Sequence, residues 1–326
     1  MHNRMCHTKF LGHNKFVIVC DKNDKPRWVW TGSTNWTPSG LCTQANNGVL
    51  IDSPTLADRF WQQLDLLAKN KNASPKALAE ENSVSTTAQV DRDATRVWFT
   101  RTLNQVDLAD AMDLIASAKD GVLFLMFQTG EKGSLLEAIL NRRNERDFFV
   151  HGVMSSAPAP GKRPARTAGP KKKPTHAETF AKQIAFVHKN ERVQYAPDLL
   201  LPFALEDPSE RWLDEFVKKN GAHAIIHSKI VVLDPFGAKP VVMTGSHNMG
   251  KNASNTNDEN LVILEGNTKL AAAYATNIIA IYDNFRWRFR VAQGSSWRGS
   301  QDSAQWQQRY LDGTIPEFAF FTGGNP

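Results

Sequence analysis

The chain has 326 residues, of which 41% are hydrophobic, and a formal net charge of +6. This length can hold two domains, and the modest positive charge favours anionic partners without identifying one. No apolar run reaches the roughly 18 residues of a membrane span, and residues 1–16 lack the apolar core of a secretory signal. The cysteines Cys6, Cys20 and Cys42 have no metal-binding spacing, which indicates reduced thiols. We therefore expect a cytoplasmic protein with no transmembrane contact.

The first part of the chain predicts a β-hairpin and a helix. Phe16–Cys20 is an apolar run that predicts a strand, Asp21–Asp24 predicts a turn, and Arg27–Thr31 predicts the partner strand. Ser53 then precedes an amphipathic helix with apolar residues at helical spacing: Leu56, Phe60, Leu64 and Leu67. The polar residues 68–92 that follow are expected to form a linker.

Residues 93–154 predict alternating strands and helices. The run Val122–Phe127 is continuously apolar, as in a parallel strand that is buried on both faces. The expected elements are a strand at Thr95–Phe99, a helix at about 107–118, a strand at Val122–Phe127, a helix at about 134–141 and a strand at Phe148–Met154. This order predicts a sheet with helices on its faces.

The remainder of the chain alternates polar stretches with shorter predicted elements. Residues 155–177 are rich in Pro, Gly, Lys and Arg, which is typical of a solvated loop and also suits a basic clamp on phosphates. Helices are expected at about 210–219 and 269–282. Arginines alternate with aromatic residues over 285–290, a pattern that suits packing by one face and also base stacking. Residues 291–326 predict a loop-rich tail.

Two segments, residues 13–51 and 227–265, repeat one pattern of polar residues about 214 positions apart. Each begins with His-x-Lys before an apolar run. Each also contains a Gly-Ser-x-Asn sequence, whose serine lies nineteen or twenty residues after the histidine. The repeated residues are His13, Lys15, Ser33 and Asn35 in the first copy and His227, Lys229, Ser246 and Asn248 in the second.

These residue types suit a phosphate group. Side chains two apart in a strand project to the same face, so each copy presents an imidazole and an ammonium together with a hydroxyl and a carboxamide. Lysine supplies charge, while Ser and Asn supply directed donors. One imidazole can attack phosphorus while the other protonates the leaving oxygen and later activates water. Glu259, eleven residues after Asn248, can orient a histidine.

The pattern resembles the HxKxxxxD and GSxN motifs of the phospholipase D superfamily. Asp234 and Glu259 complete the match in the second copy. In the first copy Cys20 stands in the place of the aspartate, Asp21 follows it, and Asn46 stands where the glutamate is expected. The match is therefore closer in the second copy.

The resemblance implies an α/β fold of two pseudo-twofold-related units, each a mixed sheet flanked by helices, with the site between them. We place the first, incomplete unit at residues 1–67 and the second at 93–290. Because little precedes the strand of His13, a missing N-terminal segment or a second copy of the chain is expected to complete the first unit.

The resemblance also implies roles. His13 would form a covalent phosphohistidine and His227 would act as acid and then as base. The phosphate would be held without metal or cofactor, and the acidic residues would have supporting roles. The residues concerned are Lys15, Lys229, Asn35, Asn248, Ser33 and Ser246 for the phosphate, and Asp21, Asp234 and Glu259 for support.

Three functions remain open at this stage. The favoured one is a phosphodiesterase that hydrolyses or transfers a phosphodiester, with phospholipid slightly preferred as substrate. A metal-independent nuclease acting on DNA or RNA is supported by the positive charge and the Arg-aromatic stretch. An inactive phosphate-binding module would follow from the incomplete first unit.

Overall fold

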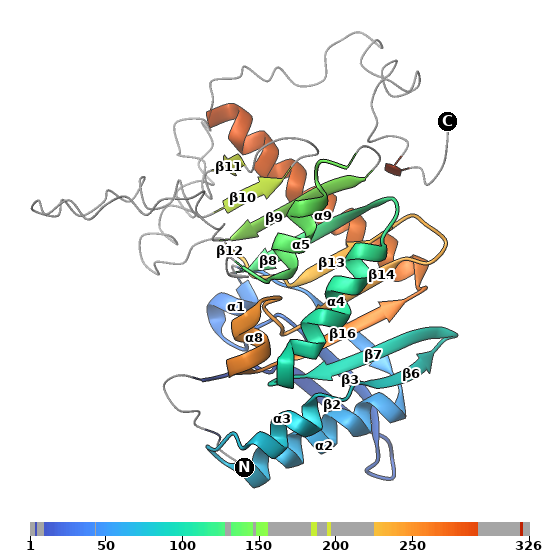
Figure 1. Ribbon diagram of the computed structural model, residues 1–326. Coiled ribbons are helices and arrows are strands. Elements are labelled where there is room, and N and C mark those ends of the chain that lie inside the picture. The colour runs from blue at the N-terminus through green and yellow to red at the C-terminus, as the bar shows by residue number, and fades with distance from the viewer. Residues whose placement is uncertain are drawn as a thin grey trace, which may run out of the picture.

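The structure is a computed structural model, and it describes residues 4, 10–42, 44–127, 132–145, 148–155, 184–187, 194–196, 225–292 and 320–321. Its largest element is a nine-stranded mixed sheet in the order β11-β10-β9-β8-β13-β14-β16-β7-β6 (Figure 1). Neighbouring strands are antiparallel except β8 and β9. The strands are β6 (Thr86–Val90), β7 (Asp93–Phe99), β8 (Gly121–Phe127), β9 (Phe149–Ser155), β10 (Ile184–Val187), β11 (Gln194–Ala196), β13 (Ile230–Leu233), β14 (Val241–Gly245) and β16 (Asn260–Glu265).

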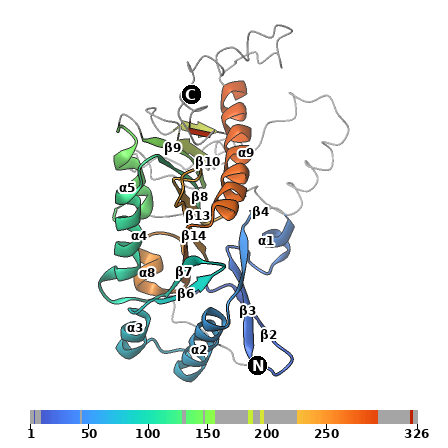
Figure 2. The same ribbon diagram turned by 90° about the vertical axis from the view of Figure 1, so that its right-hand side faces the viewer.

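Helices lie on both sides of this sheet (Figure 2). α4 (Val106–Ser117) and α5 (Leu135–Arg142) pack on one face, where their apolar residues join one buried cluster with the strands. α9 (Thr268–Ala292) and α2 (Pro54–Asn70) contribute to the cluster on the other face. The short helices are α1 (Pro38–Cys42), η1 (Leu103–Gln105), α3 (Lys76–Asn82) and α8 (Lys251–Thr256). The predicted α/β class, with a mixed sheet flanked by helices, is confirmed.

The two copies of the sequence pattern have the same order of elements. In the first copy, β2 (Phe16–Cys20), β3 (Pro26–Gly32) and β5 (Gly48–Asp52) form an antiparallel sheet, and α2 follows. Ser53 caps α2 by accepting a hydrogen bond from the amide of Leu56. In the second copy, β13, β14 and β16 are joined in the same antiparallel order, and α9 follows. The sequence repeat is thus a repeat of strand–strand–strand–helix.

Two short parallel ladders join the copies to each other. β1 (Leu11–Gly12), in the first copy, pairs with β15 (Asn257–Asp258) in the second. β12 (Ile225–Ile226), in the second copy, pairs with β4 (Gln44–Ala45) in the first. Because β1 and β12 immediately precede the two motif histidines, these ladders fix where each histidine lies relative to the opposite copy.

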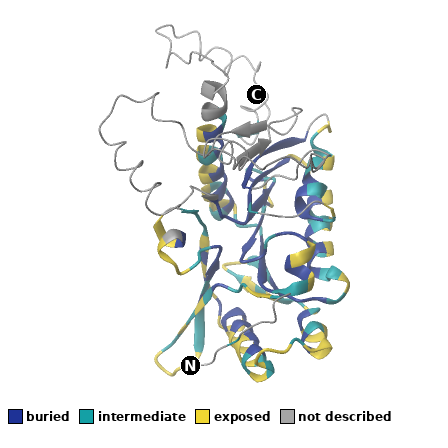
Figure 3. Cartoon of the chain, turned by 90° about the vertical axis from the view of Figure 1, so that its left-hand side faces the viewer, coloured by how far each residue is buried: buried dark blue, intermediate teal, exposed yellow. Residues whose placement is uncertain are grey.

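One face of the first-copy sheet carries exposed apolar side chains. Val17, Trp30 and Leu50 lie in register across β2, β3 and β5, and Val17 and Leu50 are 39% and 63% exposed. In Figure 3 this hairpin is teal and yellow, whereas the strands of the large sheet are mostly dark blue. The corresponding residues of the second copy are buried in the cluster that includes α4 and α5: Val231, Met243 and Ile263. Among the described residues, helices cover this face only in the second copy.

The predicted linker at residues 68–92 is wrong. This stretch contains the end of α2, then α3, then β6, which pairs with β7 at the edge of the large sheet. β6 alternates half-buried and exposed residues, as an edge strand does, and its small polar side chains conceal that alternation in the sequence. The large sheet therefore begins at Thr86, before the predicted boundary at 93.

The other predicted elements fall into three groups. Those within residues 16–154 are present, with boundaries that differ by at most three residues. The helix expected at 269–282 extends to Ala292 and so includes the Arg-aromatic stretch, of which Phe285 packs in the core. The helix expected at 210–219, most of the basic loop and most of the tail lie outside the described residues. Within the described part of the chain, no helix combines the length and hydrophobicity that crossing a membrane requires.

Candidate active site

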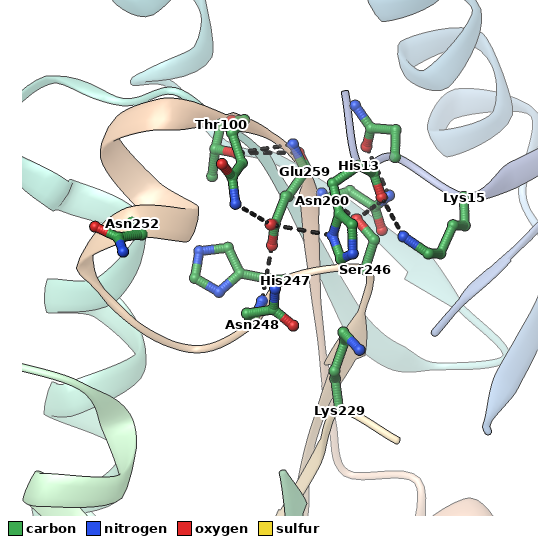
Figure 4. A network of polar contacts seen from close by, with 12 residues as sticks. His13, Lys15, Thr100, Lys229, Ser246, His247, Asn248, Asn252, Glu259 and Asn260 are labelled. Atoms are coloured by element: carbon green, nitrogen blue, oxygen red, sulfur yellow. Dashed lines mark hydrogen bonds and ion pairs between the residues drawn. The ribbon is translucent and has the colours of Figure 1, made fainter. Parts of the chain in front are cut away.

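The structure brings the motif histidines and lysines of both copies into one site. His13 and His227 follow β1 and β12, and Lys15 and Lys229 lie two residues further on. The charges of both lysines act on both histidine rings, and that of His13 acts on His227. Figure 4 shows His13 and Lys15 from one copy opposite Lys229 and Glu259 from the other. The site therefore lies where the two copies meet, as predicted.

Each histidine is held by a residue of the opposite copy. The amide of His13 donates to the carbonyl of Asp258 at 3.0 Å, and the amide of His227 donates to the carbonyl of Ala45 at 2.9 Å. These two hydrogen bonds continue the β1–β15 and β12–β4 ladders. The residue after each acceptor then reaches the histidine ring: Glu259 for His13 and Asn46 for His227.

Glu259 is a buried carboxylate that supports His13. Nδ1 of His13 lies 3.1 Å from Oε1 of Glu259, close enough for an ion pair although the alignment falls short of a good hydrogen bond. The same carboxylate accepts from the amide of Asn248 and the side chain of Asn257, both at 2.7 Å. Burial alone would raise the pKa of Glu259, but the contact with His13, the charge of His247 and the Asn257 hydrogen bond outweigh it and lower the pKa. Glu259 is therefore ionised.

Burial lowers the pKa of both histidines. For His13, Glu259 partly opposes this effect while Lys15 and Lys229 add to it. For His227, burial comes first, followed by Lys229, Lys15 and His13, and together they lower the pKa to about 3. Both rings are neutral at pH 7 while no anion is bound, so each has a ring nitrogen with a lone pair.

The two lysines are positioned identically in the two copies. Nζ of Lys15 donates to the carbonyl of His13, and Nζ of Lys229 donates to the carbonyl of His227, both at 2.7 Å. Burial is the main cause that lowers the pKa of Lys15 to about 8 and that of Lys229 well below its usual range. The charge of Lys15 also lowers the pKa of Lys229. Two buried lysine amines this close together provide a site for an anion.

The serines hold the loops that carry the motif asparagines. Ser33 and Ser246 are fully buried. The hydroxyl of Ser33 donates to Asn46 and accepts from the amide of Asn47, and that of Ser246 accepts from the amide of Asn260 at 3.0 Å. The hydroxyls expected to bind phosphate thus have partners within the protein.

The asparagines of the two motifs are half-buried, as phosphate ligands should be. Oδ1 of Asn248 is buried and has no hydrogen-bond partner among the described residues, while its backbone amide is fixed by Glu259. Because Oδ1 can only accept, the group that could donate to a phosphate oxygen is the side-chain NH₂. Asn248 and its counterpart Asn35 remain the candidates for the phosphate oxygens.

The predicted supporting aspartates lie at turns. Asp234, directly after β13, accepts hydrogen bonds from three consecutive amides at residues 119–121. Asp21 accepts from the amides of Asn23 and Lys25 in the β2–β3 turn. Both carboxylates therefore stabilise turns next to the motif strands. Asp21 does so although it lies one residue later in its motif than Asp234 does.

Three contacting groups were not predicted. His247 is fully buried, with Nε2 3.0 Å from Asp107 and Nδ1 accepting from the amide of Met249, so it fixes the turn that carries Asn248. Asn47 and Asn260, 213 residues apart, bridge the copies through Lys229 and Thr31. Aligning the copies at this offset would have found the asparagines.

Phe127 was also not predicted and forms an apolar wall. Its ring lies 4.7 Å from the ring of His227 and 5.1 Å from Nζ of Lys229. The arrangement as a whole can hold a monoanionic phosphate between two ammonium groups, with one imidazole for covalent attack and one for proton transfer. The described residues include no cluster of three or more His, Cys, Asp or Glu side chains that could hold a metal ion.

Comparisons with known proteins identify the family of the chain. The family model described as the PLD-like domain of cardiolipin synthase matches residues 2–67 and 111–282. Among solved structures, phosphatidylserine synthase from Haemophilus influenzae Rd KW20 matches with a TM-score of 0.46 and 11% identity, over 85% of this chain and 63% of that one. The comparison with curated protein sequences gives no match. Because the family model covers most of the chain and both copies of the motif, the chain belongs to the phospholipase D superfamily.

Proposed function

We propose that this protein cleaves a phosphodiester through a covalent phosphohistidine and passes the phosphoryl group to an alcohol or to water. The observation that carries the proposal is the pair of neutral imidazoles, one from each copy, beside two buried lysines. A site that only bound phosphate would need the lysines but not two histidines with lone pairs.

In the first step, Nε2 of His13 attacks phosphorus while the P–O bond to the leaving group breaks. The leaving oxygen takes a proton from His227, which the bound anion has helped to protonate because it offsets the charge of the lysines. Lys15 and Lys229 neutralise the charge on the remaining phosphoryl oxygens, a role that needs no reorganisation because both are already fixed by carbonyl groups.

In the second step, the neutral His227 takes a proton from the acceptor hydroxyl, whose oxygen attacks phosphorus. The N–P bond to His13 breaks and both residues return to their starting states. Water as acceptor gives hydrolysis, and an alcohol gives transfer. The protein side chains are the same in both cases.

A phospholipid is the substrate class that we favour. Support comes from the family model, which describes a domain of cardiolipin synthase, and from Phe127, which places an apolar ring beside His227. A nuclease is the second candidate because of the net charge of +6. Its other support is weaker, since Phe285 of the Arg-aromatic stretch packs in the core.

The test uses bis-p-nitrophenyl phosphate, which reports phosphodiester cleavage whatever the natural substrate. Wild-type protein should release p-nitrophenol, and His13→Asn and His227→Asn should each abolish release. Activity near wild type in either variant would overturn the assignment, and no release by the wild type would favour a phosphate-binding module. Phosphatidylglycerol vesicles with glycerol, and single-stranded DNA at increasing salt, then separate the lipid from the nucleic-acid substrate.

A further inference from the structure

The two copies differ at the residue that supports each active-site histidine. Asn46 and Glu259 lie 213 residues apart, and each directly follows the short strand that pairs with the opposite copy. An amide therefore contacts His227 where a carboxylate contacts His13. Because the surrounding ladders and lysine contacts are the same in both copies, the difference is one of chemistry and not of fold.

The orientation of the Asn46 amide is fixed by its neighbours. Nδ2 donates to the carbonyl of Gly40 at 2.7 Å, so Oδ1 points the other way. Oδ1 accepts from the hydroxyl of Ser33 and lies 2.8 Å from Nδ1 of His227. An amide oxygen can only accept, so Nδ1 of His227 carries the hydrogen and Nε2 carries the lone pair when the ring is neutral.

The two roles in the reaction ask for different partners. A histidine that carries phosphorus on Nε2 keeps its hydrogen on Nδ1 and stays cationic for the lifetime of the intermediate, which a buried carboxylate stabilises. A histidine that transfers protons must gain and release one in each cycle, and an amide oxygen fixes its tautomer without adding a charge that favours the protonated form. Glu259 thus suits the nucleophile, and Asn46 suits the proton-transfer residue.

We infer that Asn46 is a positioning residue that holds His227 with the hydrogen on Nδ1 and with Nε2 free to accept and deliver the proton of the reaction. This inference rests on the proposed phosphohistidine function. The surroundings of His227 agree with it: burial, Lys229, Lys15 and His13 disfavour its charged form and lower its pKa, while a hydrogen bond to the backbone of Ser33 favours that form. Because Asn46 carries no charge, it is the negative charge of a bound substrate that favours protonation of His227.

The wild-type protein provides two measurements. Long-range nitrogen–proton NMR of labelled histidine should show His227 as the Nδ1–H tautomer at neutral pH. Quenched reaction with bis-p-nitrophenyl phosphate, followed by mass spectrometry under alkaline conditions, should place the phosphoryl adduct on His13. An Nε2–H tautomer at His227, or an adduct on His227, would overturn the inference even if turnover is normal.

Asn46→Asp provides the third measurement. A carboxylate at this distance should raise the pKa of His227 by about one unit or more, and the His227-dependent limb of the pH–rate profile should move up by the same amount. Asn23→Asp, in the exposed β2–β3 turn, adds the same charge and should leave the profile unchanged. Equal profiles for both variants would contradict a positioning role. If the aspartate variant fails to fold, the wild-type tautomer decides. If no protein turns over and no adduct forms, it is the proposed function that fails.

Discussion

Nδ1 of His13, from the first copy of the motif, lies 3.1 Å from Oε1 of Glu259, from the second copy. This contact exists because β1 pairs with β15 and brings the end of one copy beside the start of the other. Both residues are shielded from water, since Glu259 is fully buried and the side chain of His13 is 12% exposed. Removing the charge of Glu259 should therefore strongly change the pKa of His13.

Glu259→Gln should reduce kcat by roughly 100-fold or more, as expected when the group that orients a catalytic histidine loses its charge. Because Glu259 raises the pKa of His13, the variant should also need a lower pH to protonate that ring. The measurement is the pH–rate profile with bis-p-nitrophenyl phosphate. Glu80→Gln, on the exposed side of α3, is the matched control. A Glu259 variant that behaves like this control would exclude the role of the carboxylate.

Lys15→Met should stabilise the folded protein while abolishing turnover. Lys15 is 6% exposed and its pKa falls from 10.5 to about 8 on folding, so keeping it charged costs on the order of 1–3 kcal/mol. The gain in unfolding free energy should be largest below pH 8, where Lys15 of the folded wild type is charged. It should shrink as the pH rises toward 10.5, because the folded wild type then keeps Lys15 neutral. Urea unfolding at several pH values measures it, with the exposed Lys76→Met as control. A destabilised variant would contradict this account.

Binding of an oxyanion should be coupled to proton uptake. The histidines and Lys229 have lowered pKa values in the empty site, and an anion beside them raises those values. Tungstate, which does not titrate near neutral pH, should therefore bind more weakly as the pH rises from 6 to 9. Calorimetry in buffers of different ionisation enthalpy counts the protons taken up. Affinity that is constant across this range would show that the groups are already protonated.

Asp107→Asn should destabilise the protein by roughly 2–4 kcal/mol, because it removes the charged partner of buried His247. Folding lowers the pKa of Asp107 and raises that of His247, the former because contacts from His247, Ser254 and Thr102 outweigh burial. The pair therefore stabilises the folded protein fully between pH 3.8 and pH 6.5, which are the pKa values of Asp107 and His247 in the unfolded chain. It is lost as the pH falls through the folded pKa of Asp107 or rises through that of His247.

Thermal unfolding from pH 4 to pH 9 tests this prediction. In wild type the unfolding temperature should be highest at acidic pH, and this maximum should disappear in the Asp107→Asn variant. Asp113→Asn, an exposed residue on the same helix, should leave the curve as it is. Parallel curves for wild type and Asp107→Asn would mean that the pair is not charged.

The exposed face of β2, β3 and β5 should cause self-association when nothing else covers it. Leu50, on the edge strand β5 of that face, is 63% exposed, and exposed apolar patches of this kind favour association. Leu50→Lys should lower the apparent mass in light scattering, whereas Leu64→Lys on α2, 44% exposed, should not. A wild-type monomer at high concentration would contradict self-association through this face.

The sequence was most informative where a pattern is repeated. The repeated pattern and its resemblance to a known family predicted a shared site for His13 and His227, with Lys15 and Lys229. The structure places these residues together because the motif recurs with the same strand order. β6 was missed because Thr86–Val90 has a strand's alternation but few apolar residues. The Asp107–His247 pair could not be predicted, since α4 and the β14 turn are 140 residues apart and meet only through the packing of α4 on the sheet.

The parallel ladders have a consequence for how activity depends on assembly. Since Glu259 and Asn46 each support the histidine of the other copy, separating the copies would remove both supports at once. An isolated copy would hold one imidazole without its partner residue and could not complete a cycle. The proposed reactive centre thus exists only when the two copies are packed together.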